Sequence, residues 1–493
     1  MLNGALIQHS TFNIQHSALF GLDLGWLLVL IQILGILSAI RAVMEARTAQ
    51  GAVAWAVSLV GFPYIALPLF WIFGRSKFEG YVIARRTDLS EASPIAKKAY
   101  ALLAERDLLV RTEHARELPF ERLAKLPFTT GNDAELLIDG DATFASIFEG
   151  IERARNYILV QFYIFRDDKI GRAFQERLLE RVRAGVRVYL LYDEIGSHNL
   201  SRHCLARMRA GGVHVASFHT VGGRANRFQL NFRNHRKIVV VDGLVAWVGG
   251  LNVGDEYLGR DPKVGYWRDT HVKVEGPVVQ TVQVAFMEDW HWASDEFPDL
   301  NWDPCRAASG ARRAILALPS GPADELETCT LFFIAAINAA TTRLWIASPY
   351  FVPDEQFITA LQLAALRGVD IRILFPKKSD NLLVSLSVWS YLDDVEKVGI
   401  EVYQYTRGFM HQKVTLIDDA ACTIGTANFD NRSFRLNFEI TMAIADATVA
   451  AQVKAMLETD FANAERITTA DLAGRSFAFR LATRVARLAA PVQ

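Results

Sequence analysis

The chain has 493 residues, of which 51% are hydrophobic, and 53 Lys and Arg nearly balance 54 Asp and Glu. This length predicts two or three structural units, and the charge balance argues against a general nucleic-acid binder, because phosphate backbones are bound by clustered basic residues. The four cysteines include no CxxC pair, which argues against a disulfide framework or a cysteine zinc site and predicts isolated buried thiols.

Two apolar stretches without charge lie near the N-terminus, at residues 24–40 and 52–73. A helix needs about 20 apolar residues to span the hydrocarbon core, with about 17 as the lower limit. We therefore predict a hairpin of two transmembrane helices over residues 24–74, after a tail over residues 1–23. Two buried helices of a soluble core are the alternative.

Basic residues follow the second apolar stretch, and they favour the cytoplasmic side of a membrane. They are Arg75, Lys77, Arg85 and Arg86, whereas no Lys or Arg precedes Leu24. The pattern predicts a cytoplasmic N-terminus, a juxtamembrane segment over residues 75–126 and a cytoplasmic C-terminal part.

Beyond about residue 127 the chain twice alternates β-branched runs with helical stretches. "YILVQFYIF" from Tyr157 and "VRVYLLYDEIG" from Val186 flank a helical segment, and "RLWIASPYF" from Arg343 and "VDIRILFP" from Val369 flank another. This predicts an α/β fold of two pseudo-symmetric halves, residues 127–300 and 301–493, each with a mixed, largely parallel sheet between helices. Residues 221–231 have no counterpart in the second half, and we expect a loop beside the site there.

One pattern occurs once in each half: His-x-Lys, four residues, Asp, six residues, a turn of small residues, and Asn. Its members are His235, Lys237, Asp242 and Asn252 in the first copy, and His411, Lys413, Asp418 and Asn428 in the second. His and Lys two positions apart on an extended strand point to the same side. Two such sets around one phosphate would supply a nucleophile on one side and a leaving-group acid on the other.

This chemistry requires two further properties of the site. Clustered carboxylates for Mg²⁺ do not accompany the motifs, so we expect no metal and no other cofactor. Each imidazole needs a carboxylate to hold its tautomer, and Asp269 and Glu439 are the candidates.

At these residues the sequence resembles the phospholipase D superfamily, whose mark is the paired HxKx4Dx6GxxN motif, and more closely its bacterial cardiolipin synthase branch. The similarity includes "NFRNHRKIVVVDG", "YWRDTHV", "SPYFVPD" and "NFDNRSFRLNFE". It implies transfer of a phosphatidyl group between two phosphatidylglycerol molecules, giving cardiolipin and glycerol through a phosphohistidine. The implied partners are phosphatidylglycerol and other membrane lipids, without nucleic acid, for a multi-pass protein of the bacterial inner membrane. Its oligomeric state stays open.

The resemblance also implies roles for the motif residues. His235 would be the nucleophile and His411 the acid and base, although the residues themselves leave this order open. Both motif lysines, Asn252 and Asn428 would hold phosphate oxygens, Asp269 and Glu439 would orient the imidazoles, and Asp242 and Asp418 would be structural. Water or phosphatidylethanolamine as acceptor, a nuclease and a non-catalytic membrane scaffold are the alternatives.

Two further features have two interpretations each. Phe477, Leu481, Val485 and Leu488 form one helical stripe, with Arg480, Arg484 and Arg487 mostly off it. This helix would rest on anionic lipid or pack on the domain. The aromatic residues Trp267, Tyr350 and Phe351 would line a lipid channel or belong to the core.

Overall fold

The computed structural model describes residues 5–46, 49–74, 100–110, 118–218 and 232–490. Its contacts divide the chain into two compact units, one with the helices before residue 78 and one with the described residues from 100 onward. The expected loop at 221–231 and the basic residues used for orientation, Arg75, Lys77, Arg85 and Arg86, lie outside the described residues.

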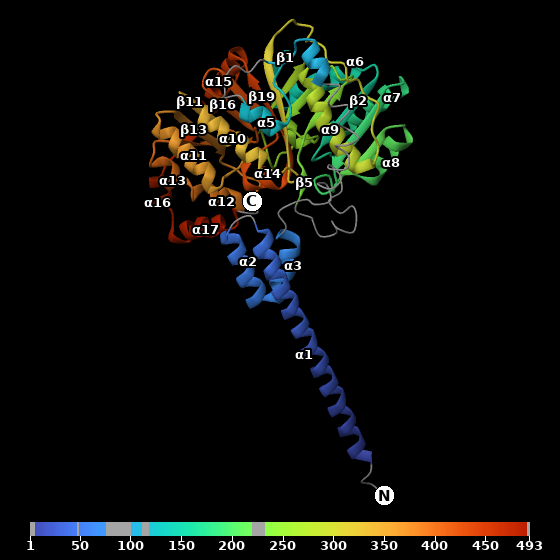
Figure 1. Ribbon diagram of the computed structural model, residues 1–493, viewed down its shortest axis with the longest axis vertical. Helices are drawn as coiled ribbons and strands as arrows, with labels where there is room; N and C mark the ends of the chain where they lie inside the picture. The colour runs from blue at the N-terminus through green and yellow to red at the C-terminus, as the bar shows by residue number, and fades with distance from the viewer. Residues whose placement is uncertain (1–4, 47–48, 75–99, 111–117, 219–231, 491–493) are drawn as a thin grey trace. The chain divides into compact units, whose positions relative to one another are not determined.

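The described residues of the N-terminal unit form three helices, α1 (Ala5–Glu45), α2 (Ala49–Gly61) and α3 (Pro63–Phe73) (Figure 1). Within α1, the 21 residues Gly25–Glu45 are long and apolar enough to cross a membrane, with a mean hydropathy of 2.3. Leu59 and Phe70 are buried where the three helices pack together. The first predicted span is therefore a single helix in the structure.

The second predicted span is not a continuous helix, which corrects our expectation for residues 52–73. The chain leaves the helical conformation at Phe62, with φ −137° and ψ 57°, and Pro63 begins α3. A residue before proline is sterically driven out of the α region, and proline has no N–H for the preceding turn. The resulting helices have 13 and 11 residues, and each is shorter than the roughly 20 needed to span a bilayer.

The described part of the second unit begins at residues 100–110, of which 100–105 are helical. It continues with α5 (Leu118–Ala124) and then forms the first half. The strands of the first half are β1 (Thr129–Ile138), β2 (Tyr157–Phe162), β3 (Arg187–Asp193), β4 (His214–Phe218), β5 (Arg233–Asn234), β6 (Ile238–Val241), β7 (Val245–Gly249), β8 (Trp267–Arg268) and β9 (Thr270–Glu275). Its α-helices are α6 (Asp139–Arg153), α7 (Lys169–Arg183), α8 (Arg202–Ala210) and α9 (Val278–Ser294).

The second half repeats this order. Its strands are β10 (Arg313–Ser320), β11 (Arg343–Ala347), β12 (Phe351–Val352), β13 (Asp370–Pro376), β14 (Glu401–Tyr405), β15 (Phe409–Met410), β16 (Val414–Ile417), β17 (Ala421–Gly425), β18 (Phe429–Asp430), β19 (Asn437–Ala445) and β20 (Ala464–Ile467). Its helices are α10 (Thr328–Ala339), α11 (Glu355–Leu366), α12 (Leu382–Trp389), α13 (Leu392–Glu396), α14 (Asn431–Arg435), α15 (Ala447–Ala462), α16 (Thr469–Ala473) and α17 (Phe477–Leu488).

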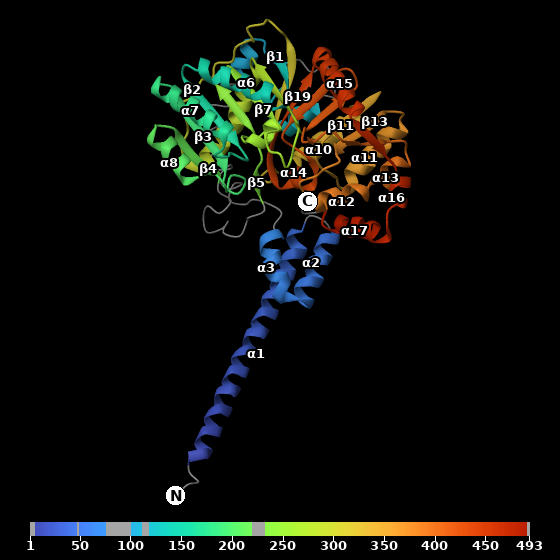
Figure 2. The same ribbon diagram turned by 180° about the vertical axis from the view of Figure 1, so that it is seen from behind.

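The two halves share one sheet, joined where β1 and β10 pair antiparallel (Figures 1 and 2). From this seam the order is β1-β9-β7-β6-β2-β3-β4 on one side and β10-β19-β17-β16-β11-β13-β14-β20 on the other. The matching orders confirm two pseudo-symmetric halves, each a mixed sheet flanked by helices. Equivalent helices even start alike, since Asp168 caps α7 and Asp354 caps α11 through their side chains.

The sheet is less parallel than predicted. Along this order only β2-β3-β4 and β11-β13-β14 run parallel, and the other neighbouring pairs are antiparallel. The short strand β5, beside this path, also pairs parallel with β19. Helical crossovers return the chain in the same direction only in those two triplets, whereas β6 and β7 are joined by a tight turn that reverses it. The strand–helix alternation in the sequence describes only the outer part of each half.

Two further expectations change with the structure. Cys204, Cys329 and Cys422 are buried thiols as predicted, but Cys305 is exposed, because it lies in the irregular segment between the halves. Within the predicted juxtamembrane segment, Phe120 of α5 packs edge-on against Phe332 at a centroid distance of 5.3 Å. This part of residues 75–126 therefore joins the core of the second half.

Candidate active site

The two His-x-Lys motifs lie on extended backbone just before β6 and β16, and each is bonded to the other half. The N–H of His235 donates to the carbonyl of Phe438 at 2.9 Å, and the N–H of His411 donates to that of Arg268 at 2.7 Å. Short parallel pairs support these contacts, β5 with β19 and β15 with β8. Each motif is thus held beside the residue that precedes the opposite half's candidate carboxylate.

Each imidazole meets a carboxylate from the opposite half. Nδ1 of His235 lies 3.0 Å from both oxygens of Glu439, and Nδ1 of His411 lies 2.8 Å from Oδ2 of Asp269. Both carboxyl side chains are 0% exposed. A carboxylate at Nδ1 holds the proton there and leaves Nε2 unprotonated in a neutral ring. The sequence identified both carboxylates as candidates, and in the structure each one contacts the imidazole of the other half.

The two motif lysines are buried in the same region. Nζ of Lys237 donates to the carbonyl of His235 at 2.6 Å, and Nζ of Lys413 lies 2.9 Å from Nδ1 of His411. Each lysine lies within electrostatic range of both Glu439 and Asp269, so the two motifs surround one site. Burial lowers the pKa of Lys413 to about 8 and that of Lys237 well below its usual value.

Burial also sets the charge of the imidazoles. It lowers the pKa of His235 to about 4 and, together with the nearby Lys413, lowers that of His411 to about 3. Burial opposes ionisation of Glu439 and Asp269, but the facing imidazole and lysine prevail and hold both pKa values below their usual range. At neutral pH the site contains two neutral imidazoles beside two carboxylates.

The motif asparagines differ in their surroundings. Oδ1 of Asn252 accepts from the N–H of Ile164 at 3.1 Å, and its Nδ2 donates to the hydroxyl of Tyr257 at 3.0 Å. Oδ1 of Asn428 is buried and has no hydrogen-bond partner within the described part of the chain. Their contact with phosphate oxygens stays a prediction.

The motif aspartates lie at the far ends of β6 and β16 and anchor neighbouring strands. Asp242 accepts from the N–H groups of Arg155, Asn156 and Tyr157 at 2.7–2.8 Å, at the start of β2. Asp418 makes the equivalent contacts to residues 341–343 at the start of β11. Both occupy the left-handed region, with φ of 56° and 54°. These contacts agree with the structural role that the resemblance implies, and that role stays a prediction.

Several residues around the carboxylates were not predicted as donors to them. Nε1 of Trp267 donates to Asp269 at 3.2 Å, and Nδ2 of Asn437 donates to Glu439 at the same distance. Each donor precedes its carboxylate by two positions, so aligning the halves about the carboxylates would have found them. Thr426 also donates to Glu439, at 2.5 Å.

The aromatic residues divide between site and core. The ring centroids of Trp267 and His411 are 5.1 Å apart. The ring of Tyr163, which was not predicted, lies at the same centroid distance from that of His235. Phe351 is a core residue at 1% exposure, and the hydroxyl of Tyr350 donates to Asp380 at 2.7 Å.

Buried aspartates bind polar side chains that adjoin the motif histidines and the candidate carboxylate Asp269. Asp460 accepts from Nε and Nη2 of Arg268 and from Nε2 of Gln412, each at 2.8 Å. In the first half, Asp289 accepts from Arg236 at 2.8 Å. Asp289 lies on α9, 20 positions after Asp269, and Asp460 lies on α15, 21 positions after Glu439. A sequence comparison of the two halves that included these helices would have identified both aspartates.

Glycine at position 250 leaves room for Asp269, since a Cβ there would lie 2.0 Å from Oδ1. We expect Gly250→Ala to displace this carboxylate and to lower kcat about 10²-fold, the usual effect of a misplacement near 1 Å. The measurement is turnover at saturating substrate together with the thermal unfolding midpoint. Gly474→Ala is the control, because its Cβ would have no contact closer than 3.6 Å. Equal activity of both variants would contradict the prediction.

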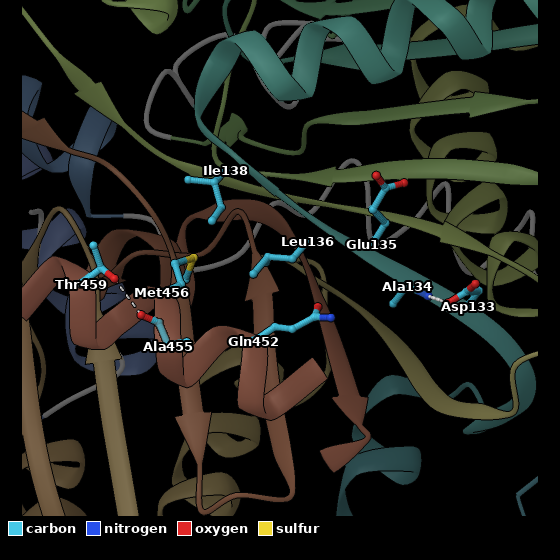
Figure 3. Close-up of a pocket in the computed structure, with 9 residues that line it drawn as sticks. All are labelled: Asp133, Ala134, Glu135, Leu136, Ile138, Gln452, Ala455, Met456 and Thr459. Carbon is cyan, nitrogen blue, oxygen red and sulfur yellow. Dashed lines mark hydrogen bonds between the residues drawn. The ribbon is translucent and has the colours of Figure 1, made fainter. Parts of the chain in front are cut away.

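A hollow of about 770 Å³ lies elsewhere, between β1 and α15 (Figure 3). Asp133, Glu135 and Leu136 line it from the strand, and Gln452, Met456 and Thr459 line it from the helix. The residues drawn include no member of either motif. Geometry around the imidazoles, and not the size of this hollow, therefore locates the candidate site.

Comparisons with known proteins agree with this geometry. The family described as cardiolipin synthase, PLD-like domain, matches residues 147–290 and 333–461, once in each half. Cardiolipin synthase A of Pseudomonas fluorescens is 47% identical over 473 residues, covering 95% of this chain and 98% of that protein. The chain belongs to the cardiolipin synthase family.

Other relatives extend this result. Cardiolipin synthase A of Pseudomonas aeruginosa is 47% identical over 476 residues, covering 95% of this chain and 96% of that protein. The crystal structure of phosphatidylserine synthase from Haemophilus influenzae has a TM-score of 0.60 at 14% identity, covering 77% of this chain and 100% of that one. At that identity the likeness shows a shared fold. This chain thus has the fold of the family over both halves.

Proposed function

We propose that this protein transfers a phosphatidyl group from one phosphatidylglycerol to another and releases glycerol. The observation that carries the proposal is the pair of buried imidazoles, each held by a carboxylate of the opposite half around a site with two lysines. Membership of the cardiolipin synthase family supports phospholipid as the substrate class.

In the first step, Nε2 of His235 attacks the phosphorus of the donor lipid. The P–O bond to the glycerol headgroup breaks, and His411, protonated at Nε2, gives its proton to the departing oxygen. Burial disfavours this imidazolium in the empty site, but the negative charge of a bound phosphodiester favours it. The product is a phosphatidyl group on His235, with the proton gone to glycerol.

In the second step, a hydroxyl of the acceptor phosphatidylglycerol gives its proton to His411 and attacks phosphorus. The P–N bond to His235 breaks, which yields cardiolipin and restores both imidazoles. Glu439 and Asp269 hold the two rings by their Nδ1 atoms throughout. Lys237, Lys413, Asn252 and Asn428 offset charge on the phosphate oxygens. No step requires a metal.

The proposed location is the bacterial inner membrane, with the two halves in the cytoplasm. The long apolar stretch in α1 supports attachment to a membrane, and a multi-pass arrangement would require α2 and α3 to cross together. The proposed partners are phosphatidylglycerol and other membrane lipids, and no nucleic acid.

The test uses membranes containing the full chain and headgroup-labelled phosphatidylglycerol, with and without a chelator. Cardiolipin and free glycerol in equal amounts, insensitive to the chelator, are the expected products. Phosphatidic acid in place of cardiolipin would instead identify a hydrolase that uses water as acceptor. Unchanged lipid would reject the proposed substrate.

The rate should depend on pH through Lys413, whose pKa is about 8. Its protonated form binds phosphate, so kcat/KM, which reports the free enzyme, should fall about tenfold per pH unit above 8. Lys413→Arg should remove the contribution of this residue to the alkaline limb and leave that of Lys237, because arginine stays protonated. The measurement is kcat/KM between pH 6 and 10 for both proteins, and an identical limb in the variant would assign it to another group.

A further inference from the structure

The C-terminal helix α17 is attached to the second half through one face. Thr483 and Ala486 are buried, at 1% and 2% exposure, and the Phe479 ring packs edge-on against Trp389 of α12 at 5.8 Å. Arg487 donates to Asp394 at 3.0 Å. The helix does pack on the domain, but these contacts do not use the apolar stripe found in the sequence.

That stripe faces away from the domain. Phe477, Leu481, Val485 and Leu488 are 73%, 51%, 56% and 80% exposed. Their spacing of four, four and three places them on one side of a helix. Exposing four large apolar side chains in a row is unfavourable in water, because each loses the free energy of burial. The arrangement indicates that something apolar covers them.

The charges on α17 indicate which kind of apolar surface would cover the stripe. Its twelve residues include three arginines and no acidic residue. Arg480 and Arg484 are exposed and lie along one edge of the stripe by their helical positions. Such a helix suits the interface of an anionic bilayer, where apolar side chains enter the acyl boundary and arginines reach phosphates.

The helix is also coupled to the motif of the second half. Nδ2 of Asn431 donates to the carbonyl of Ala490, just beyond α17, and to that of Val352. Asn431 follows the motif residue Asn428 by three positions. On the α12 side, Leu382 and Leu383 are 75% and 48% exposed. They directly follow the turn carrying Asp380, which is within electrostatic range of Lys413.

We propose that the stripe of α17 docks in the interface of an anionic phospholipid bilayer and holds the second motif at the lipid surface. The contact is separate from any transmembrane anchor and from the chemistry of transfer. It places the site where a diacyl substrate needs to move only along the bilayer. The expected ligand is a lipid surface with phosphate headgroups, not a single lipid molecule.

The test reconstitutes the full chain in phosphatidylcholine vesicles with and without phosphatidylglycerol. Val485→Cys, in a Cys305→Ser background, carries an environment-sensitive fluorophore, and nitroxide on the lipid acyl chains serves as quencher. We expect a blue-shifted, quenched signal with phosphatidylglycerol that weakens at high salt. The control label is Leu366→Cys at the end of α11, where the native side chain is 72% exposed, and it should stay unquenched.

Each other result would overturn the proposal. A water-like signal at position 485 would show that the stripe stays in solvent. A blue-shifted but unquenched signal would show that protein covers it, either this chain or a second copy. Equal quenching in pure phosphatidylcholine would reject an anionic surface.

Activity gives a second readout that separates docking from catalysis. Leu481→Asn with Val485→Asn should lower turnover on vesicles about tenfold, since two side chains lose apolar contact. Turnover on detergent-solubilised lipid should be unchanged. Leu366→Asn is the matched control and should change neither rate. An equal loss in both assays would overturn docking while leaving the transfer reaction in place.

Discussion

Replacing either motif histidine by alanine should lower cardiolipin formation by about 10⁶-fold, which is the scale seen when the nucleophile or the histidine of a catalytic triad is removed. The two losses should differ in what accumulates. His411→Ala keeps the nucleophile but loses the acid for the departing glycerol, so a phosphatidyl group should form on His235 slowly and then remain there, whereas His235→Ala should carry no label. The reason is that the second imidazole is required to activate the acceptor that discharges the first.

The measurement is retention of label from phosphate-labelled phosphatidylglycerol after an alkaline quench, because phosphohistidine survives base. His203→Ala is the control, an exposed histidine on α8. Label on His411 in the His235→Ala protein would reverse the assigned order of the two imidazoles. Label in neither variant would show that loss of His411 already blocks the first step, in which it protonates the departing glycerol.

Glu439→Gln should impair His235, and Asp269→Asn should impair His411, although each changed residue lies in the opposite half from the imidazole it affects. An amide of the same shape does not hold the Nδ1 proton as a carboxylate does, and the corresponding change in other histidine-carboxylate systems costs about 10⁴-fold in turnover. We expect losses of about 10³- to 10⁴-fold here. Each carboxylate is fully buried, so some loss of stability should accompany the change.

A spectroscopic readout distinguishes misorientation from unfolding. In protein with ¹⁵N-labelled histidine, Glu439→Gln should shift the ring resonances of His235 and leave those of His411 in place, and Asp269→Asn should do the reverse. Asp133→Asn is the control for loss of a carboxylate, because Asp133 lies on β1 beside the hollow of Figure 3. Shifts within the same half would contradict the crossed pairing.

The crossed pairing explains why the two halves act together. His235 has its carboxylate on β19 and His411 has its carboxylate next to β8, so neither half alone contains a complete imidazole–carboxylate pair. The backbone bonds from His235 to Phe438 and from His411 to Arg268 fix this exchange. Separating the halves would remove both pairs at once.

The sequence by itself determined the repeat, the α/β class and the motif residues. It did so because strand and helix periodicities are local, and because the same spacing of His, Lys, Asp and Asn occurs in both halves. It also identified Asp269 and Glu439 as candidates, since each imidazole needs a carboxylate to hold its tautomer. The apolar character of residues 24–40 was equally local, and α1 contains it as one helix.

The tertiary structure alone decided which partners meet. The antiparallel pairing of β1 with β10 brings the halves into one sheet, and the pairing of β5 with β19 across the halves places Glu439 beside His235, 204 positions away in the chain. The antiparallel direction of most strands was not predicted, because buried strands of either direction show the same apolar runs. The break at Phe62 is a local steric effect of Pro63 inside an otherwise uniform apolar stretch. Which face of α17 stays exposed depends on α12, a neighbour that periodicity does not reveal.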